Sequence, residues 1–322
     1  MWRMGSFLVL EGREPDPLRR NRRPCCSNWN VRALMRAVLG IDAAWTATQP
    51  SGVAVAAESF EGWRLIGIAT SYQRFHDLAD GRLMNAQRSL GSLPNAPDLI
   101  ASACTLCGTA IDLVAIDMPM AHSHIVGRRF CDNEVSRAYG ARKCGTHSPS
   151  AIRPGHISDD LKIGFERAGY PLLTNALGSR GIIEVYPHPA LVELAIAPIR
   201  LPYKVSRVRS YWPLAKPVER RRRLYEIWSE IVSLLDAQIA GVAAVLPELP
   251  LDAGTVELKA YEDSLDAVVC AWVGICALEG KGRPFGDENS AIWIPNARTA
   301  SHLSLPIEGG ENVTEPGGVA GA

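Results

Sequence analysis

Four acidic residues occupy positions where an apolar pattern would not place a charge. Asp117 ends the run "IDLVAIDMPM", Asp42 interrupts "GIDAAW", and Glu184 lies within "IIEVYPH". Asp266 lies in the helical pattern "EDSLDAVVCAW". A carboxylate buried among apolar residues without a partner is costly, so this recurrence calls for a chemical explanation.

Structural explanations exist for several of these residues. Asp117 stands before Met-Pro, which is typical of a turn that ends a strand. Glu184 fits a strand that faces solvent on one side, and Asp263 fits a helix N-cap. Asp42 is the hardest to explain in this way, because apolar residues surround it.

The chemical explanation is a metal site. Carboxylates near the ends of neighbouring strands, about 5 Å apart, would converge, and converging charges need a cation among them. Oxygen ligands favour Mg²⁺ or Mn²⁺ over zinc. Two such ions about 3.5–4 Å apart stabilise the attacking and leaving oxygens of a phosphodiester. The predicted metal ligands and catalytic residues are Asp42, Asp117, Glu184 and Asp266.

These residues must be positioned by a mixture of strands and helices. Short apolar runs predict strands over residues 37–45, 52–59, 62–71, 112–119 and 180–189. Helical spacing predicts helices over residues 97–109, 216–246 and 261–280. Short connections between the first three strands indicate an antiparallel meander, and crossover connections then add parallel strands.

This order predicts an α/β protein with a ribonuclease H-like fold. We expect a mixed five-stranded sheet, its first three strands antiparallel, with helices on both faces. A helical and loop segment, about residues 120–180, is inserted between strands four and five. The expected domain is 35–302, between a disordered basic N-terminal arm at 1–34 and a disordered, Gly-rich tail at 303–322. Met35 is an alternative start to Met1.

Composition narrows the class of protein. The chain has 322 residues, 47% hydrophobic and 21% charged, with a net charge of zero, so any attraction for nucleic acid must come from a local patch. No signal peptide or membrane span is evident, and we expect a cytoplasmic protein with reduced thiols. Cys104 and Cys107 form a CxxC without a second pair, which favours core packing over zinc binding.

Candidate substrate contacts lie in the insertion and after the fifth strand. The predicted phosphate-binding residues are Arg129, Arg137, Arg153, Lys204 and Arg207. Intrahelical ion pairs on a surface helix would equally explain the first two, and snorkelling side chains would explain the last two. His156 lies in a loop, and His188 could shuttle protons or have no role.

At these residues the chain resembles the ribonuclease H-like nucleases called domain-of-unknown-function family 429. The resemblance rests on "GIDAAW", "IDMPM", "RRFCDNEVSRAYG", "SPSAIRP", "EVYPHPALVEL", "LPYK" and "YEDSLDAVVCAW", which span about residues 38–280. It implies a ribonuclease H-like fold and a metal-dependent carboxylate site at the four acidic positions already named.

The predicted function is a metal-dependent phosphodiester hydrolase, a nuclease that uses Mg²⁺ or Mn²⁺ and acts on nucleic acid or another phosphodiester. One alternative is a kinase- or ATPase-like enzyme on the same superfold, which processes nucleotides or sugar phosphates. Its Gly-rich turn after the first aspartate is missing here, where the sequence is "DAAWTATQPSG". A non-catalytic binding module is the other alternative. No membrane partner is expected, and the oligomeric state is open.

Overall fold

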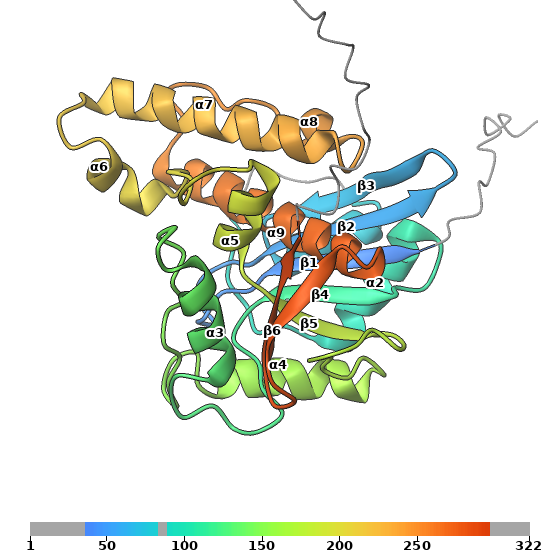
Figure 1. Ribbon diagram of the computed structural model, residues 1–322. Coiled ribbons are helices and arrows are strands. Elements are labelled where there is room, and N and C mark those ends of the chain that lie inside the picture. The colour runs from blue at the N-terminus through green and yellow to red at the C-terminus, as the bar shows by residue number, and fades with distance from the viewer. Residues whose placement is uncertain (1–35, 83–88, 297–322) are drawn as a thin grey trace, which may run out of the picture. The chain divides into compact units, whose positions relative to one another are not determined.

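The computed structural model describes residues 36–82 and 89–296 (Figure 1). The expected N-terminal arm (1–34) and tail (303–322) lie outside the described residues. The expectations for both segments therefore stay predictions.

One mixed sheet of seven strands forms the centre of the described part, so the predicted number of five is wrong. The strands follow one another across the sheet in the order β3-β2-β1-β4-β5-β7-β6. They are β1 (Ala37–Asp42), β2 (Gly52–Ser59), β3 (Gly62–Ala69), β4 (Leu113–Asp117), β5 (Gly181–Val185), β6 (Gly282–Gly286) and β7 (Ala291–Pro295).

The strand directions agree with the prediction for the five strands that the sequence indicated. β1 pairs antiparallel with β2, and β2 pairs antiparallel with β3. β1, β4, β5 and β7 then run parallel to one another. β1 and β4 are apolar on both sides up to their last residue, which is typical of central strands covered on two faces.

The β6–β7 hairpin escapes sequence prediction for a physical reason. β6 has the sequence GRPFG, in which two glycines and a proline disfavour a strand. β7 is an apolar run of only five residues. Both elements depend on tertiary partners, since β7 pairs with β5 and β6 covers the outer edge of β7.

Helices cover both faces of the sheet, as predicted (Figure 1). One hydrophobic core contains α5 (Pro187–Leu194), α7 (Pro217–Asp236), α8 (Val242–Val245) and α9 (Thr255–Leu278). The core on the other face contains α1 (Tyr72–Ala79), α2 (Ala96–Cys107) and α4 (His156–Arg167). The remaining elements are α3 (Phe130–Tyr139), which packs on β6 and β7, and the short η1 (Val205–Arg207) and α6 (Val208–Tyr211).

Two glycines let α9 lie directly against β1 and β2. A Cβ atom at Gly40 would overlap the carbonyl oxygen of Ala267, and a Cβ atom at Gly52 would overlap that of Asp263. Any side chain at either position would push the helix away from the sheet. Gly40 and Gly52 therefore fix how far the acidic residues of α9 stand from the strand ends.

Several helix and strand boundaries differ from the prediction, and three of the differences have a clear cause. α9 begins at Thr255, six residues before the predicted start, because the Glu257 side chain accepts a hydrogen bond from the Gly254 N–H at 2.6 Å. The pattern over 216–246 divides into α7 and α8, since the Asp236 side chain accepts hydrogen bonds that turn the chain after α7. The fifth strand is shorter than predicted, because Pro187 already begins α5.

Two expectations about composition can be compared with the structure. Cys104 and Cys107 are free thiols on α2, with Cys107 buried in the core and Cys104 packed against it. Within residues 36–82 and 89–296, no helix combines the length and apolar character needed to cross a bilayer.

Candidate active site

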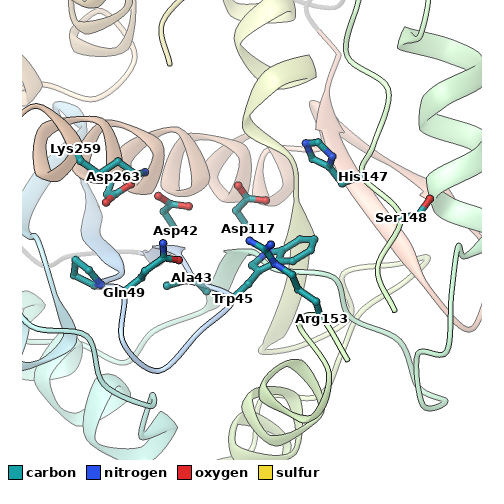
Figure 2. A pocket seen from close by; sticks show the side chains of 12 residues that line it. Asp42, Ala43, Trp45, Gln49, Asp117, His147, Ser148, Arg153, Lys259 and Asp263 are labelled. Carbon is teal, nitrogen blue, oxygen red and sulfur yellow. Dashed lines mark hydrogen bonds and ion pairs between the residues drawn. The ribbon is translucent and has the colours of Figure 1, made fainter. Parts of the chain in front are cut away.

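Asp42 and Asp117 end two neighbouring parallel strands. They are the last residues of β1 and β4, and they are direct partners in the ladder between these strands. Partners in a parallel ladder point to the same face of the sheet, and the strands lie about 4.8 Å apart. Figure 2 shows both carboxylates directed toward α9. The predicted convergence of these two residues therefore appears in the structure.

Neither carboxylate has a side-chain partner. Asp42 and Asp117 are half-buried, and neither forms a side-chain hydrogen bond or ion pair with any described residue. Partly buried carboxylates in proteins are ordinarily paired or hydrogen-bonded. This pair instead faces a cavity of about 560 Å³, which we call the acidic cavity.

Burial and like charge shift both groups toward the protonated form. Burial raises the pKa of Asp42 well above its ordinary value, and the charges of Asp266 and Asp263 raise it further. Burial raises the pKa of Asp117 to about 7, with Asp266 again adding to the shift. The pair thus stores electrostatic repulsion that a bound cation would relieve.

Two acidic residues of α9 lie over this pair, each with a lysine. Asp263 accepts a hydrogen bond from Lys259, four residues before it on the same helix. Asp263 lies well inside α9, so the N-cap interpretation is wrong. Burial raises the pKa of Asp263, while Lys259 lowers it.

Asp266 is fully buried and is already held by two donors. The Tyr203 hydroxyl donates to Asp266 Oδ1 at 2.8 Å, and the Lys204 ammonium pairs with Oδ2. Lys204 also lies 3.4 Å from a carboxylate oxygen of Glu262. Lys204 lines a cavity, as predicted, and its ammonium is already paired with acidic residues of the protein. Its contact with substrate stays a prediction.

Glu184 does not join the pair, contrary to the prediction. Its partner across the ladder on β4 is Ile116, not Asp117, so its side chain points to the opposite face of the sheet. There it is buried, accepts a hydrogen bond from the Met120 N–H at 2.7 Å, and forms a two-point ion pair with Arg129. Burial raises the pKa of Glu184, and Arg129 opposes that shift.

Arg129 is likewise a structural residue and not an exposed phosphate ligand. Its guanidinium contacts both oxygens of Glu184, at 2.5 and 2.7 Å, and Asp132 Oδ1 at 2.9 Å. It also donates to the Met120 carbonyl oxygen at 2.8 Å. The side chain is 6% exposed. Arg129, Asp132 and Glu184 are here called the buried triad. The guanidinium donors of Arg129 are used within the protein, so none is left to bind substrate.

The other predicted cations have different surroundings. Arg153 lines the acidic cavity, with its guanidinium 5.8 Å from the centre of the Trp45 ring (Figure 2). Arg207 lines a second cavity, described next. Arg137 is exposed, pairs with Glu134 on its own helix, and lines neither cavity. The surface-helix interpretation therefore applies to Arg137.

A second cavity of about 340 Å³ adjoins the first and is called the basic cavity. The two share Trp45, Asp117, His147 and Lys259, so they form one cleft with Asp117 at the junction. The described Arg, Lys and His side chains that line the basic cavity are Arg129, His147, His188, Arg200, Lys204, Arg207 and Lys259. His156 is exposed and lines neither cavity.

The cleft also contains residues that were not among the sequence-predicted site residues, including Trp45, His147, Arg200 and Lys259. The spacing of Lys259 from Glu262 and Asp263, at i+3 and i+4 on one helix, is a signal that could have identified it. Arg200 and His147 lie in loops, where sequence spacing carries no information about their neighbours. Their position depends on how the insertion and the α5–η1 connection fold over the sheet.

The donor set fits a magnesium-like ion with few protein ligands. Among the described residues, no three His, Cys, Asp or Glu side chains gather into a metal-binding group. Mg²⁺ commonly binds through one or two carboxylates, keeps several waters and takes further oxygens from substrate phosphate. Asp42 and Asp117 are the two carboxylates that could hold such an ion, since neither has a side-chain partner among the described residues.

Comparison with known proteins gives one match. Residues 167–291 match the model of a family described as "Protein of unknown function (DUF429)". This segment includes Glu184, Lys204 and Asp266, and it excludes Asp42 and Asp117. Comparison with curated proteins finds no match, and comparison with solved structures finds none.

Proposed function

We propose that this protein is a metal-dependent phosphodiester hydrolase, with nucleic acid or a smaller phosphodiester as substrate. The observation that carries the proposal is the pair Asp42 and Asp117, which face one cavity and have no side-chain partner within residues 36–82 and 89–296. Two adjoining carboxylates with raised pKa values and an open cavity beside them are a functional-site signature. A pair with no ligand to bind would only destabilise the fold.

The proposed fold is ribonuclease H-like. Strand order β3-β2-β1-β4-β5, with the first three strands antiparallel, is the order expected of that fold, and the β7–β6 hairpin extends it at one edge. In this arrangement the carboxyl ends of β1 and β4 meet at the same edge of the sheet. Asp42 and Asp117 owe their proximity to that topology.

Each residue around the pair has a proposed role. Asp42 and Asp117 would hold Mg²⁺ or Mn²⁺. Such an ion, when bound, lowers the pKa of a bound water and neutralises charge on the phosphoryl oxygens. Asp266, fixed by Tyr203 and Lys204 on the α9 side of the pair, adds negative potential there without being a direct ligand. The acidic cavity gives room for substrate beside both carboxylates.

The two alternative functions receive less support. A kinase-like site would need an open, Gly-rich turn after Asp42, but Trp45 of this turn lines the acidic cavity. Gly52 serves helix packing, because a side chain there would strike α9. A binding module without metal chemistry would have no use for two unpaired carboxylates, whose repulsion lowers stability.

The test combines metal binding with hydrolysis. Mn²⁺ binding to the full chain is measured by isothermal titration calorimetry, and hydrolysis is measured on bis(p-nitrophenyl) phosphate and on single-stranded and duplex oligonucleotides. Asp42→Asn and Asp117→Asn should each lower hydrolysis at least about 1,000-fold, because metal-assisted charge stabilisation contributes several kcal/mol. Both variants should also lose Mn²⁺ binding.

Asp160→Asn is the matched control, because Asp160 is an exposed aspartate on α4. It should leave binding and hydrolysis unchanged. The proposal is wrong if wild-type protein binds no divalent ion, or if Asp42→Asn hydrolyses phosphodiesters as fast as wild type.

A further inference from the structure

The basic cavity carries more positive charge than its own acidic residues neutralise. Arg129 is bound within the buried triad. Lys204 is neutralised by Asp266 and Glu262, and Lys259 pairs with Glu262 and Asp263. Each of these cations therefore already has a carboxylate within the protein.

Arg200 and Arg207 remain without acidic partners among the described residues. Arg207 is exposed at the end of η1, where an unpaired guanidinium is common. Arg200 differs, because its Nε atom is buried and has no hydrogen-bond partner. A buried donor left unpaired costs free energy, and a bound acceptor would remove that cost.

His188 supplies a second unpartnered group in the same cavity. The residue is 6% exposed, and its Nδ1 atom is buried without a hydrogen-bond partner. Its ring lies edge-on between Tyr186 and Tyr203, with ring centres 5.3 and 5.4 Å away. Burial and the neighbouring cations Lys204 and Arg200 lower the pKa of His188, which keeps the ring neutral. Bound negative charge would oppose that effect.

We propose that Arg200, Arg207 and His188 form a phosphate subsite in the basic cavity. Guanidinium groups match the oxygens of phosphate in paired hydrogen bonds, and a 340 Å³ cavity has room for a phosphate group with part of its ester. The identification of this phosphate as part of the substrate rests on the proposed function. Asp117 lines both cavities. A phosphate held in the basic cavity would therefore be the substrate phosphate adjacent to the phosphodiester that is hydrolysed.

The probe for this subsite is inorganic phosphate, titrated calorimetrically into the full chain in metal-free, low-salt buffer. Arg200→Gln and Arg207→Gln should each weaken binding about tenfold or more, the usual cost of losing a charge-assisted hydrogen bond. His188→Phe keeps the aromatic packing and should weaken binding severalfold. Arg209→Gln is the matched control, because Arg209 is exposed on α6 and lines neither cavity.

Folding is controlled by circular dichroism, and Arg200→Lys serves as a second variant that keeps the charge and should retain part of the affinity. The subsite is disproved if wild-type protein binds no phosphate, or if Arg209→Gln weakens binding as much as Arg200→Gln. Oligonucleotides with a 5′ phosphate and with a 5′ hydroxyl then identify the natural source. A larger effect of Arg200→Gln on the phosphorylated one indicates a terminal phosphate, and equal effects indicate an internal diester.

The two proposals fail separately. Asp42→Asn should lose Mn²⁺ binding and keep phosphate binding, since Asp42 does not line the basic cavity. Phosphate binding without Mn²⁺ binding or hydrolysis would remove the hydrolase and leave the anion site. Hydrolysis that depends on Asp42 but is unaffected by Arg200→Gln and Arg207→Gln would remove the subsite and leave the hydrolase.

Discussion

Two groups of acidic residues lie on opposite faces of the same sheet, and only one of them is neutralised by a partner within the described residues. In the buried triad, Glu184 and Asp132 surround Arg129, and every oxygen of Glu184 has a donor within 2.7 Å. On the face toward α9, Asp42 and Asp117 have no side-chain partner in the part of the chain that the structure describes. Asp42, Asp117 and Glu184 nevertheless share one sequence feature, because each is an acidic residue in or at the end of an apolar strand.

The difference shows which carboxylates are available for chemistry. The triad is electrostatically complete, so it holds the insertion to the sheet and has nothing left to offer a ligand. The pair is incomplete, and burial, followed by the charge of Asp266, raises the pKa of both carboxyl groups. Burial alone therefore does not identify a functional carboxylate, whereas burial without a partner beside a cavity makes a carboxylate a candidate for one.

The largest expected effect comes from breaking the triad. Arg129→Met would leave Glu184 and Asp132 buried without their cation, and we expect a loss of about 3–5 kcal/mol in the free energy of unfolding. Urea unfolding followed by circular dichroism measures it. Arg137→Met, on the exposed face of the same helix region, should change stability by no more than about 0.5 kcal/mol. Equal effects of the two substitutions would refute the structural role of the triad.

Removing one charge from the pair should instead increase the free energy of unfolding of the metal-free protein. The folded pKa of Asp117 is about 7, against about 3.9 for an unfolded aspartate. Between these values the folded state keeps a proton that the unfolded state releases. The free energy of unfolding should therefore fall as pH rises from about 4 to 7 and beyond, since the pKa of Asp42 is also raised.

Asp42→Asn should flatten this decline and stabilise the metal-free protein by about 1–2 kcal/mol at pH 8, where 1.36 kcal/mol corresponds to one pKa unit. Urea unfolding at pH 5 and pH 8 measures the change. A variant less stable than wild type at pH 8 would mean that the pair is already neutralised within the protein.

The smallest effect concerns Lys259, a partly exposed cation that lines the acidic cavity with the pair. Lys259 lowers the pKa of Asp117, so Lys259→Gln should move the pH-dependent loss of stability to higher pH. Because the lysine side chain is 51% exposed, screening limits the shift to less than about one pH unit. The measurement is the same pH series of unfolding curves, with Lys216→Gln as an exposed control. A shift to lower pH would contradict the assigned geometry.

Much of the site follows from local sequence. The runs ending in Asp42 and Asp117 are apolar on both faces, which identifies buried parallel strands, and two carboxylates at the ends of such strands meet at one edge. The spacing of Asp263 and Asp266 on a helix rich in apolar residues places both near the sheet. These inferences depend on the repeat of side-chain direction every two residues in a strand and every 3.6 residues in a helix, which can be recognised from the sequence alone.

Other features depend on contacts between distant segments. Glu184 faces away from Asp117 because β5 pairs with β4 one residue out of the register that would align them, and a shift of one residue turns every side chain to the other face. Register is set by core packing and by what the insertion supplies, here Arg129. The β6–β7 hairpin likewise forms only because β5 offers an open edge.

The sequence by itself determined the mixed α/β class, the antiparallel start of the sheet, helices on both faces and the pairing of Asp42 with Asp117. Only the tertiary structure decided which other charges reach that pair and which neutralise one another elsewhere. The reason is physical. Secondary structure follows local periodicity, whereas the availability of a charge depends on whether a side chain distant in sequence lies within hydrogen-bonding distance of it.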